Sequence, residues 1–133
     1  MKNIILLIFM FISSMNISFA DSLNKKVKMQ TYEGYHRESC FHAKENDKLH
    51  VLFHSPHQIG FGIHWHTGGV YNTKTHNLVP YQEYYDSQEH SYSVTIPEDS
   101  TYCFDFTNLN EIKKVSSFEI SLSYTLNQPK NSD

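Results

Sequence analysis

Residues 49–66 read LHVLFHSPHQIGFGIHWH and carry the clearest structural pattern in the chain. A Ser-Pro turn signal separates two halves of this segment. In both halves the apolar side chains fall at odd positions, namely Leu49, Val51, Phe53, Ile59, Phe61, Ile63 and Trp65. Side chains alternate between the two faces of a strand, so this period of two predicts two strands that each bury one face.

The even positions of the same segment form the opposite face. They are His50, Leu52, His54, Gly60, Gly62, His64 and His66. If the two strands pair as one hairpin over a shared core, odd positions pair with odd positions. A three-residue loop then places His50 opposite His64, and a longer loop places it opposite His66. Either register predicts a face on which the histidines of both strands gather.

The same alternation extends over most of the chain. Further strands are expected at 27–32, 38–43, 90–96, 101–107 and 115–126. The segment 68–89 is polar and rich in tyrosine, and we expect it to be mostly loop with an edge strand near 78–85. Seven or eight short strands separated by turn signals predict an all-β fold, an antiparallel β-sandwich with one apolar face on each strand.

The first twenty residues have the order of a secretory signal peptide. Lys2 precedes an unbroken apolar run at 4–12, and Ser18-Phe19-Ala20 forms a small-x-small cleavage site. The apolar run is about half the length that a membrane-spanning helix needs. We therefore expect cleavage after Ala20 and a periplasmic or secreted product without a membrane span. Its parts are a stub at 21–26, a sandwich at 27–126 and a flexible tail at 127–133.

The 133 residues carry a net charge of −3 and include nine histidines and two cysteines. This length allows one domain, and the charge gives no basic surface for nucleic acid. An oxidising compartment makes a disulfide between Cys40 and Cys103 the expected state. The alternative is a nucleophilic or metal-binding thiol, with His42 close to Cys40 in sequence.

Several short motifs resemble the lumenal GOLD (Golgi-dynamics) domain of the secretory cargo-receptor family. They are Cys40-Phe41, the alternating strand at 49–53, Gly68-Gly69, Tyr102-Cys103-Phe104 followed by Asn108, Lys114-Val115 and Phe118-Glu119-Ile120. The resemblance covers roughly residues 27–126 and implies a jelly-roll-like binding domain whose two cysteines are bonded. The family's coiled coil, membrane span and cytosolic tail have no counterpart before Asp133, so the resemblance does not extend to vesicle cargo sorting.

The histidines suggest one candidate site. His64 and His66 project from the same face of a strand, a geometry that binds Zn²⁺ or Cu²⁺ when a neighbouring strand adds a third ligand. His50 or His54 is the expected third ligand in the predicted hairpin. The alternatives are a solvated outer face without metal and a pH-sensitive group of imidazoles.

Four tyrosines in the 68–89 segment form a second candidate site. Tyr71, Tyr81, Tyr84 and Tyr85 are good contact residues because they offer a large surface with little side-chain entropy. Alternatively, they pack the segment onto the sandwich. Since the chain has no nucleophile elbow, phosphate-binding glycine loop or zinc-protease motif, catalysis is not expected.

The sequence therefore predicts a non-catalytic extracytoplasmic binding domain that recognises a protein or another exported ligand. A secreted or periplasmic Cu- or Zn-binding protein is the second hypothesis. Metal analysis of untagged protein would separate the two.

Overall fold

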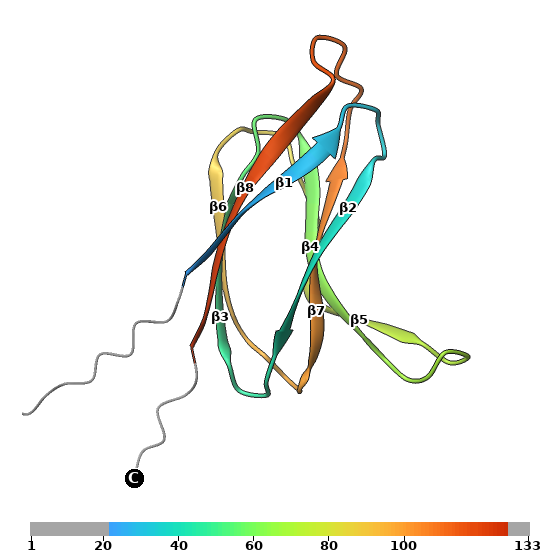
Figure 1. The fold of residues 1–133 in the computed structure, drawn as a ribbon, viewed down its shortest axis with the longest axis vertical. Helices are drawn as coiled ribbons and strands as arrows, with labels where there is room; N and C mark the ends of the chain where they lie inside the picture. Colours follow the sequence, from blue (N-terminus) through green and yellow to red (C-terminus); the bar gives the residue numbers. More distant parts are fainter. Residues whose placement is uncertain (1–21, 128–133) are drawn as a thin grey trace, which may run out of the picture.

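The computed structural model describes residues 22–127, which form eight antiparallel strands. The strands are β1 (Leu23–Gln30), β2 (His36–Ala43), β3 (Lys48–His54), β4 (Ile59–Thr67), β5 (Lys74–Tyr84), β6 (Glu89–Thr95), β7 (Ser100–Asn108) and β8 (Ser117–Asn127). They form two four-stranded sheets that face each other across one core (Figure 1). The predicted all-β sandwich of seven or eight short strands is confirmed.

The strand order is that of a jelly roll. One sheet, which we call sheet A, has the order β1-β8-β3-β6, and the other, sheet B, has the order β2-β7-β4-β5. Successive strands along the chain therefore change sheet at almost every connection. Among the described strands, β4 and β5 are the only chain neighbours that pair with each other.

The predicted hairpin between 49–54 and 59–66 is wrong, because β3 lies in sheet A and β4 in sheet B. The alternation of odd and even positions nevertheless assigned the buried faces correctly. The buried residues are Leu49, Val51 and Phe53 on β3 and Ile59, Phe61 and Ile63 on β4. Two strands can share a core either within one sheet or from opposite sheets. Phe53 and Phe61 meet across the core with their ring centroids 4.2 Å apart.

The segment 68–89 was expected to be mostly loop with an edge strand near 78–85. The edge strand is present, but as the eleven-residue strand β5 it begins earlier, at Lys74, so the segment is not mostly loop. This strand lies at the edge of sheet B and is exposed over most of its length, so it lacks the alternation that marks a buried face. Pro80 lies where the β4–β5 register shifts, between Val79 and Tyr81. An edge strand with such an irregularity tolerates a residue that has no N–H to donate.

The expected stub at 21–26 also differs, because β1 begins at Leu23 and pairs with β8 along its whole length. The first four residues of β1 are exposed, so pairing with β8 rather than burial makes this segment a strand. The predicted signal peptide lies outside the described residues, as do residues 128–133 of the expected tail. Within 22–127 no helix is long and apolar enough to cross a membrane.

The predicted disulfide is confirmed, and it joins two neighbouring strands of sheet B. Cys40 on β2 is the register partner of Cys103 on β7, with their Cα atoms 4.0 Å apart and a separation of 63 in sequence. A loop of this length corresponds to about 4 kcal/mol in the chain-entropy account of disulfide stabilisation. The side chains beside it, Phe41 and Tyr102, point to the core, so the bridge lies toward the outer face of the sheet.

Candidate functional site

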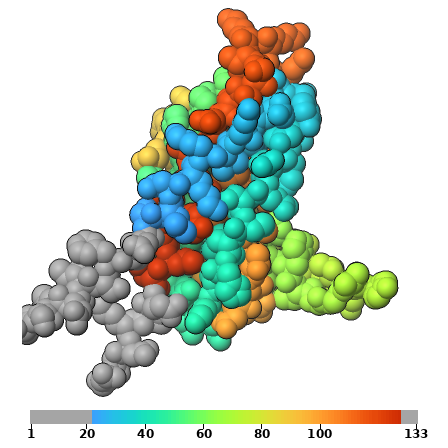
Figure 2. Space-filling view, viewed as in Figure 1, coloured from blue at the N-terminus to red at the C-terminus, as the bar shows by residue number. Residues whose placement is uncertain are grey.

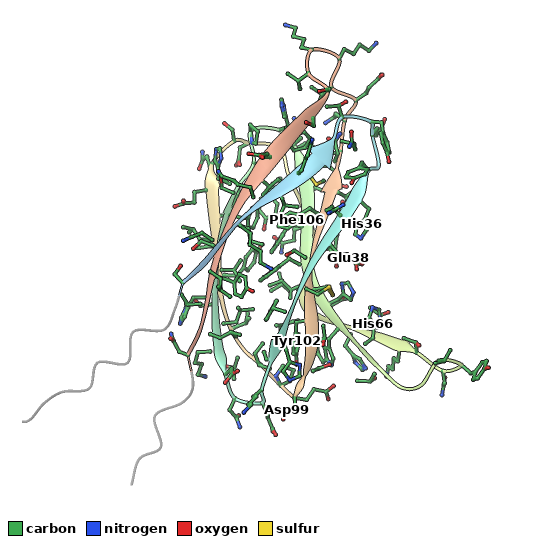
Figure 3. The ribbon with its side chains drawn as sticks, viewed as in Figure 1. His36, Glu38, His66, Asp99, Tyr102 and Phe106 are labelled. Carbon is green, nitrogen blue, oxygen red and sulfur yellow. A yellow bond between two sulfur atoms is a disulfide. The ribbon has the colours of Figure 1, made fainter. Side chains whose placement is uncertain are left out.

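The outer face of sheet B holds a group of polar side chains from three adjacent strands, which we call the His–carboxylate cluster. Its members are His36 and Glu38 on β2, Asp105 on β7, and His64 and His66 on β4. Side chains alternate between the two faces of each strand, so the sequence neighbours of these residues fill the core, as Phe104 and Phe106 do on β7. In Figure 3, His36 and Glu38 lie along β2, and His66 lies where the β4–β5 hairpin leaves the sandwich.

His64 is the centre of the cluster and is almost fully buried, with 7% of its surface exposed. Its Nδ1 lies in hydrogen-bond contact with Oδ2 of Asp105, and its Nε2 lies 3.0 Å from Nε2 of His66. The other nitrogen of His66, Nδ1, lies 3.1 Å from Oγ1 of Thr75 on β5. One continuous chain of contacts therefore runs across three strands, from β7 through β4 to β5.

Glu38 connects the remaining imidazole to this chain. Its Oε1 lies 3.3 Å from Nε2 of His36 and 4.0 Å from Nε2 of His64. His36 Nε2 also lies 3.6 Å from Oδ1 of Asp105. These distances place three imidazoles and two carboxylates in one connected group.

Burial raises the pKa of the Asp105 carboxyl above its ordinary value. The hydrogen bond with His64 acts in the opposite direction, while the charge of Glu38 raises this pKa further. Among the described residues, Oδ1 of Asp105 is buried without a hydrogen-bond partner. The cluster thus holds a carboxylate whose negative charge is poorly solvated.

The four predicted metal ligands do not come together. His64 and His66 are neighbours as expected, but His50 and His54 lie on β3, in the other sheet. His50 is exposed, and its Nδ1 lies 2.9 Å from Oγ of Ser93. His54 lines a cavity of about 270 Å³ over sheet A together with Lys26 and other polar residues. The expected third ligand from β3 is therefore wrong, since β3 and β4 face outward on opposite sides of the sandwich.

Sequence reasoning missed Glu38, Asp105 and His36 as members of a site. The signal that places the two acids together is the disulfide, because pairing Cys40 with Cys103 in an antiparallel register also pairs Glu38 with Asp105. The neighbouring β7–β4 register that brings these acids to His64 pairs strands far apart in sequence. No local pattern reports that register.

The second candidate surface is a hairpin extension, which we call the arm (residues 67–74). The pairing of β4 with β7 ends at Trp65, and beyond this point β4 pairs only with β5. Figures 1 and 2 show the hairpin extending away from the body of the sandwich. At its tip Val70 is 91% exposed and Tyr71 is fully exposed.

The turn at the tip is defined by backbone geometry. Gly68 has a φ of +96°, and a side chain there would overlap the backbone of Asn72. The carbonyl of Gly69 accepts a 2.9 Å hydrogen bond from the N–H of Asn72 and a 3.1 Å bond from Oγ1 of Thr73. The arm is therefore an ordered turn, and its two apolar side chains project from it.

The four predicted contact tyrosines have different environments. Tyr71 lies at the arm tip, and Tyr85 is 61% exposed just after β5. Tyr81 is 50% exposed and covers Gly60, where a side chain would overlap its ring. Tyr84 packs on the core, with its ring centroid 5.5 Å from that of Phe53. Of the four, Tyr71 is the one that projects furthest from packing contacts.

Trp65, which was expected in the core, is half-buried and packs against its edge. Its ring stacks on His76 with centroids 4.9 Å apart, and its Nε1 donates a 2.7 Å hydrogen bond to Glu98. The stack on His76 joins the two strands at the base of the arm, and the hydrogen bond to Glu98 fixes this base to the connection between β6 and β7. This anchoring explains how a narrow extension can keep a defined direction.

No family model and no curated protein matches the chain, so the resemblance to the GOLD domain stays a prediction. Solved structures do match in fold. The periplasmic inhibitor of g-type lysozyme PliG from Aeromonas hydrophila aligns over 80% of this chain and 87% of its own, with 11% identity and a TM-score of 0.53. PliG from Salmonella Typhimurium gives 14% identity and a TM-score of 0.46, over 80% of this chain and 88% of its own.

The Yersinia pseudotuberculosis-derived mitogen also aligns, over 86% of this chain and 93% of its own, with 10% identity and a TM-score of 0.48. At such identities a match reports architecture alone. The comparisons therefore show similarity of fold, and of these three structures the A. hydrophila inhibitor gives the highest TM-score.

Proposed function

We propose that this chain is a non-catalytic, extracytoplasmic domain that binds a protein through the tip of the arm. The observation that carries the proposal is the exposure of Val70 and Tyr71, two apolar side chains on an ordered projection. Tyrosine is enriched among the residues that dominate protein interfaces, because it buries a large area with few rotatable bonds. A narrow convex tip of this kind fits a concave site on a partner.

Two further observations support the compartment and the type of partner. The Cys40–Cys103 disulfide is typical of oxidising compartments, which favours a periplasmic or secreted location together with the predicted signal peptide. The jelly-roll fold also occurs in a periplasmic inhibitor of g-type lysozyme. By this fold-level analogy, a cell-wall lytic enzyme of the lysozyme class is the first partner to test.

The test measures lysis of bacterial cell walls by purified g-type lysozyme in the presence of this protein, with c-type lysozyme in parallel. We expect the parent protein to bind and slow the g-type enzyme. A variant with Val70→Ser and Tyr71→Ser should bind about 30-fold more weakly, as expected for a hot spot of about 2 kcal/mol. Affinity is measured by surface plasmon resonance.

The matched control is Tyr32→Ser, which removes another exposed tyrosine, on the connection between β1 and β2. It should retain the affinity of the parent. Absence of both binding and inhibition by the parent protein would refute the lysozyme partner. Equal binding by the parent and the arm variant would refute the arm as the contact surface.

A further inference from the structure

The His–carboxylate cluster places two carboxylates side by side on the outer face of sheet B. Glu38 and Asp105 are direct register partners on β2 and β7. Like charges directly opposite each other in an antiparallel pair are destabilising. Asp105 is only 16% exposed, so water screens its charge poorly. A positive charge bound at this place on the outer face of sheet B would therefore reduce the repulsion between the two carboxylates.

The imidazole nitrogens are oriented so that two of them face each other. An ionised Asp105 accepts the Nδ1–H of His64, and Oγ1 of Thr75 is placed to accept the Nδ1–H of His66. In this arrangement both Nε2 atoms carry lone pairs, and they lie 3.0 Å apart. In the other tautomer of His66 its Nε2–H donates to Nε2 of His64 and Oγ1 of Thr75 donates to its Nδ1, so a cation bound by both Nε2 atoms would take the place of that shared proton. Two nitrogens bound to one tetrahedral Zn²⁺, at 2.0–2.1 Å each, lie roughly 3.3 Å apart.

A third ligand is available on β2. Oε1 of Glu38 lies 4.0 Å from Nε2 of His64, and Nε2 of His36 lies 3.3 Å from the same oxygen. On the β2 side, His36, Glu38 and Asp105 place one potential ligand atom each within 4.8 Å of one another. The set of His64, His66 and Glu38 is more open, because Glu38 approaches His64 and not His66, so binding one ion there requires the Glu38 side chain to move toward β4. The carboxylate of Asp105 behind His64 matches the arrangement in which a second carboxylate fixes the tautomer of a metal-ligating histidine.

We propose that the His–carboxylate cluster binds one imidazole-preferring divalent cation, Zn²⁺ or Cu²⁺, through Nε2 of His64, Nε2 of His66 and the carboxylate of Glu38. Nε2 of His36 lies beside the proposed carboxylate ligand, 3.3 Å from Oε1 of Glu38. Asp105 and Thr75 orient the two imidazoles of β4. Imidazole with carboxylate is a donor set that both ions accept, and a divalent charge offsets the two acids. This site is independent of the arm tip and of the partner proposed for it.

The first experiment is calorimetric titration of untagged, chelator-treated, disulfide-bonded protein with Zn²⁺ and, separately, with Cu²⁺. We expect one ion per chain. Loss of a ligand in His66→Ala or Glu38→Gln should weaken binding by more than the roughly 10- to 100-fold expected for loss of an orienting group in Asp105→Asn. Preferential binding of one ion identifies which of the two the site takes.

The matched controls are His50→Ala and His54→Ala, which remove histidines from the opposite sheet. They should bind the ion as the parent does. The Tyr71→Ser variant should also bind normally, so failure of the metal site and failure of the arm are separable. Circular dichroism confirms that each variant is folded before titration.

Electron paramagnetic resonance of the Cu²⁺-loaded protein gives a second, independent measurement. Coupling to at least two imidazole nitrogens is expected in the parent, and to one fewer in His66→Ala. The proposal is overturned if the parent binds neither ion stoichiometrically. It is also overturned if His50→Ala weakens binding as much as His66→Ala.

Discussion

The segments on the two sides of β4 behave in opposite ways. On its N-terminal side, β3 shows a regular alternation of buried and exposed residues and a short connection to β4, yet it lies in a different sheet from β4. On its C-terminal side, β5 is polar, contains Pro80 and is largely exposed, yet it forms a hairpin with β4. The strength of a periodic pattern therefore says little about which neighbour a strand pairs with.

The reason is that alternation records burial, and burial is common to both sheets of a sandwich. β3 and β4 face each other across the core, where Phe53 contacts Phe61, so both have one apolar face. β5 lies at an edge and buries Val79 fully among its eleven residues. Its pairing rests on backbone hydrogen bonds, which carry no side-chain signature.

The largest expected difference between the β3–β4 and β4–β5 connections is the distance between spin labels placed on the two strands of each. Spin labels at His50→Cys and His66→Cys should lie farther apart than the roughly 10 Å that separates packed sheets. Their Cβ atoms would lie about 5 Å apart if β3 and β4 formed a hairpin. Pulsed electron paramagnetic resonance measures this distance.

The control for this measurement is a pair of labels across the β4–β5 hairpin, at His66→Cys and Thr75→Cys, which are register partners. These labels should be close together. A short distance between the labels at 50 and 66 would contradict the placement of β3 and β4 in opposite sheets.

Core packing between β3 and β4 gives the next largest effect. Phe53→Ala removes a side chain that is 1% exposed and contacts rings from both sheets, and it should lower the free energy of unfolding by about 3–5 kcal/mol. Tyr71→Ala on the arm should change it by less than about 0.5 kcal/mol. Urea unfolding measures both. Similar losses in the two variants would refute this contrast.

A smaller and local effect is expected in the arm turn. Gly68→Ala places a methyl group against the backbone of Asn72 at a positive φ, which costs about 1–3 kcal/mol. Because the turn projects from the sandwich, the cost should appear as faster amide hydrogen exchange at 67–74 while the core amides keep their protection. Gly69→Ala is the matched control, since its side chain would meet no atom within 4 Å. Faster exchange throughout the core would contradict an independent arm.

The smallest effect is a pH dependence of the free energy of unfolding, which arises in the core that the two sheets share. Burial raises the pKa of Tyr124, which contacts Phe41 and Phe104 across the sheets with ring centroids 5.1 Å away in both cases. The unfolded chain loses this phenolic proton near pH 10, before the folded protein does. The free energy of unfolding should therefore fall as the pH rises above about 10, and Tyr124→Phe should make this fall shallower. Urea unfolding at a series of alkaline pH values tests it, and equal slopes in both proteins would contradict it.

The candidate sites were predictable to different extents. The strand alternation placed His64 and His66 on one face, and composition selected Tyr71 as a contact residue. Neither could add Glu38, because its approach to His64 crosses β7 and depends on two registers at once. The disulfide fixes the first of these registers from sequence, and the second follows only from the way the jelly roll closes.

By itself, the amino-acid sequence determined which faces of most strands are buried, that seven or eight short strands form and that Cys40 pairs with Cys103. These features follow from local alternation, turn residues and the count of cysteines, all of which are read within or between short segments. Only the tertiary structure decided that β3 and β4 lie in opposite sheets, that the edge strand β5 extends over Lys74–Tyr84, and that three histidines meet two acids. The physical reason is that a hydrogen-bond ladder between distant strands is formed by the backbone, which is nearly the same at every residue.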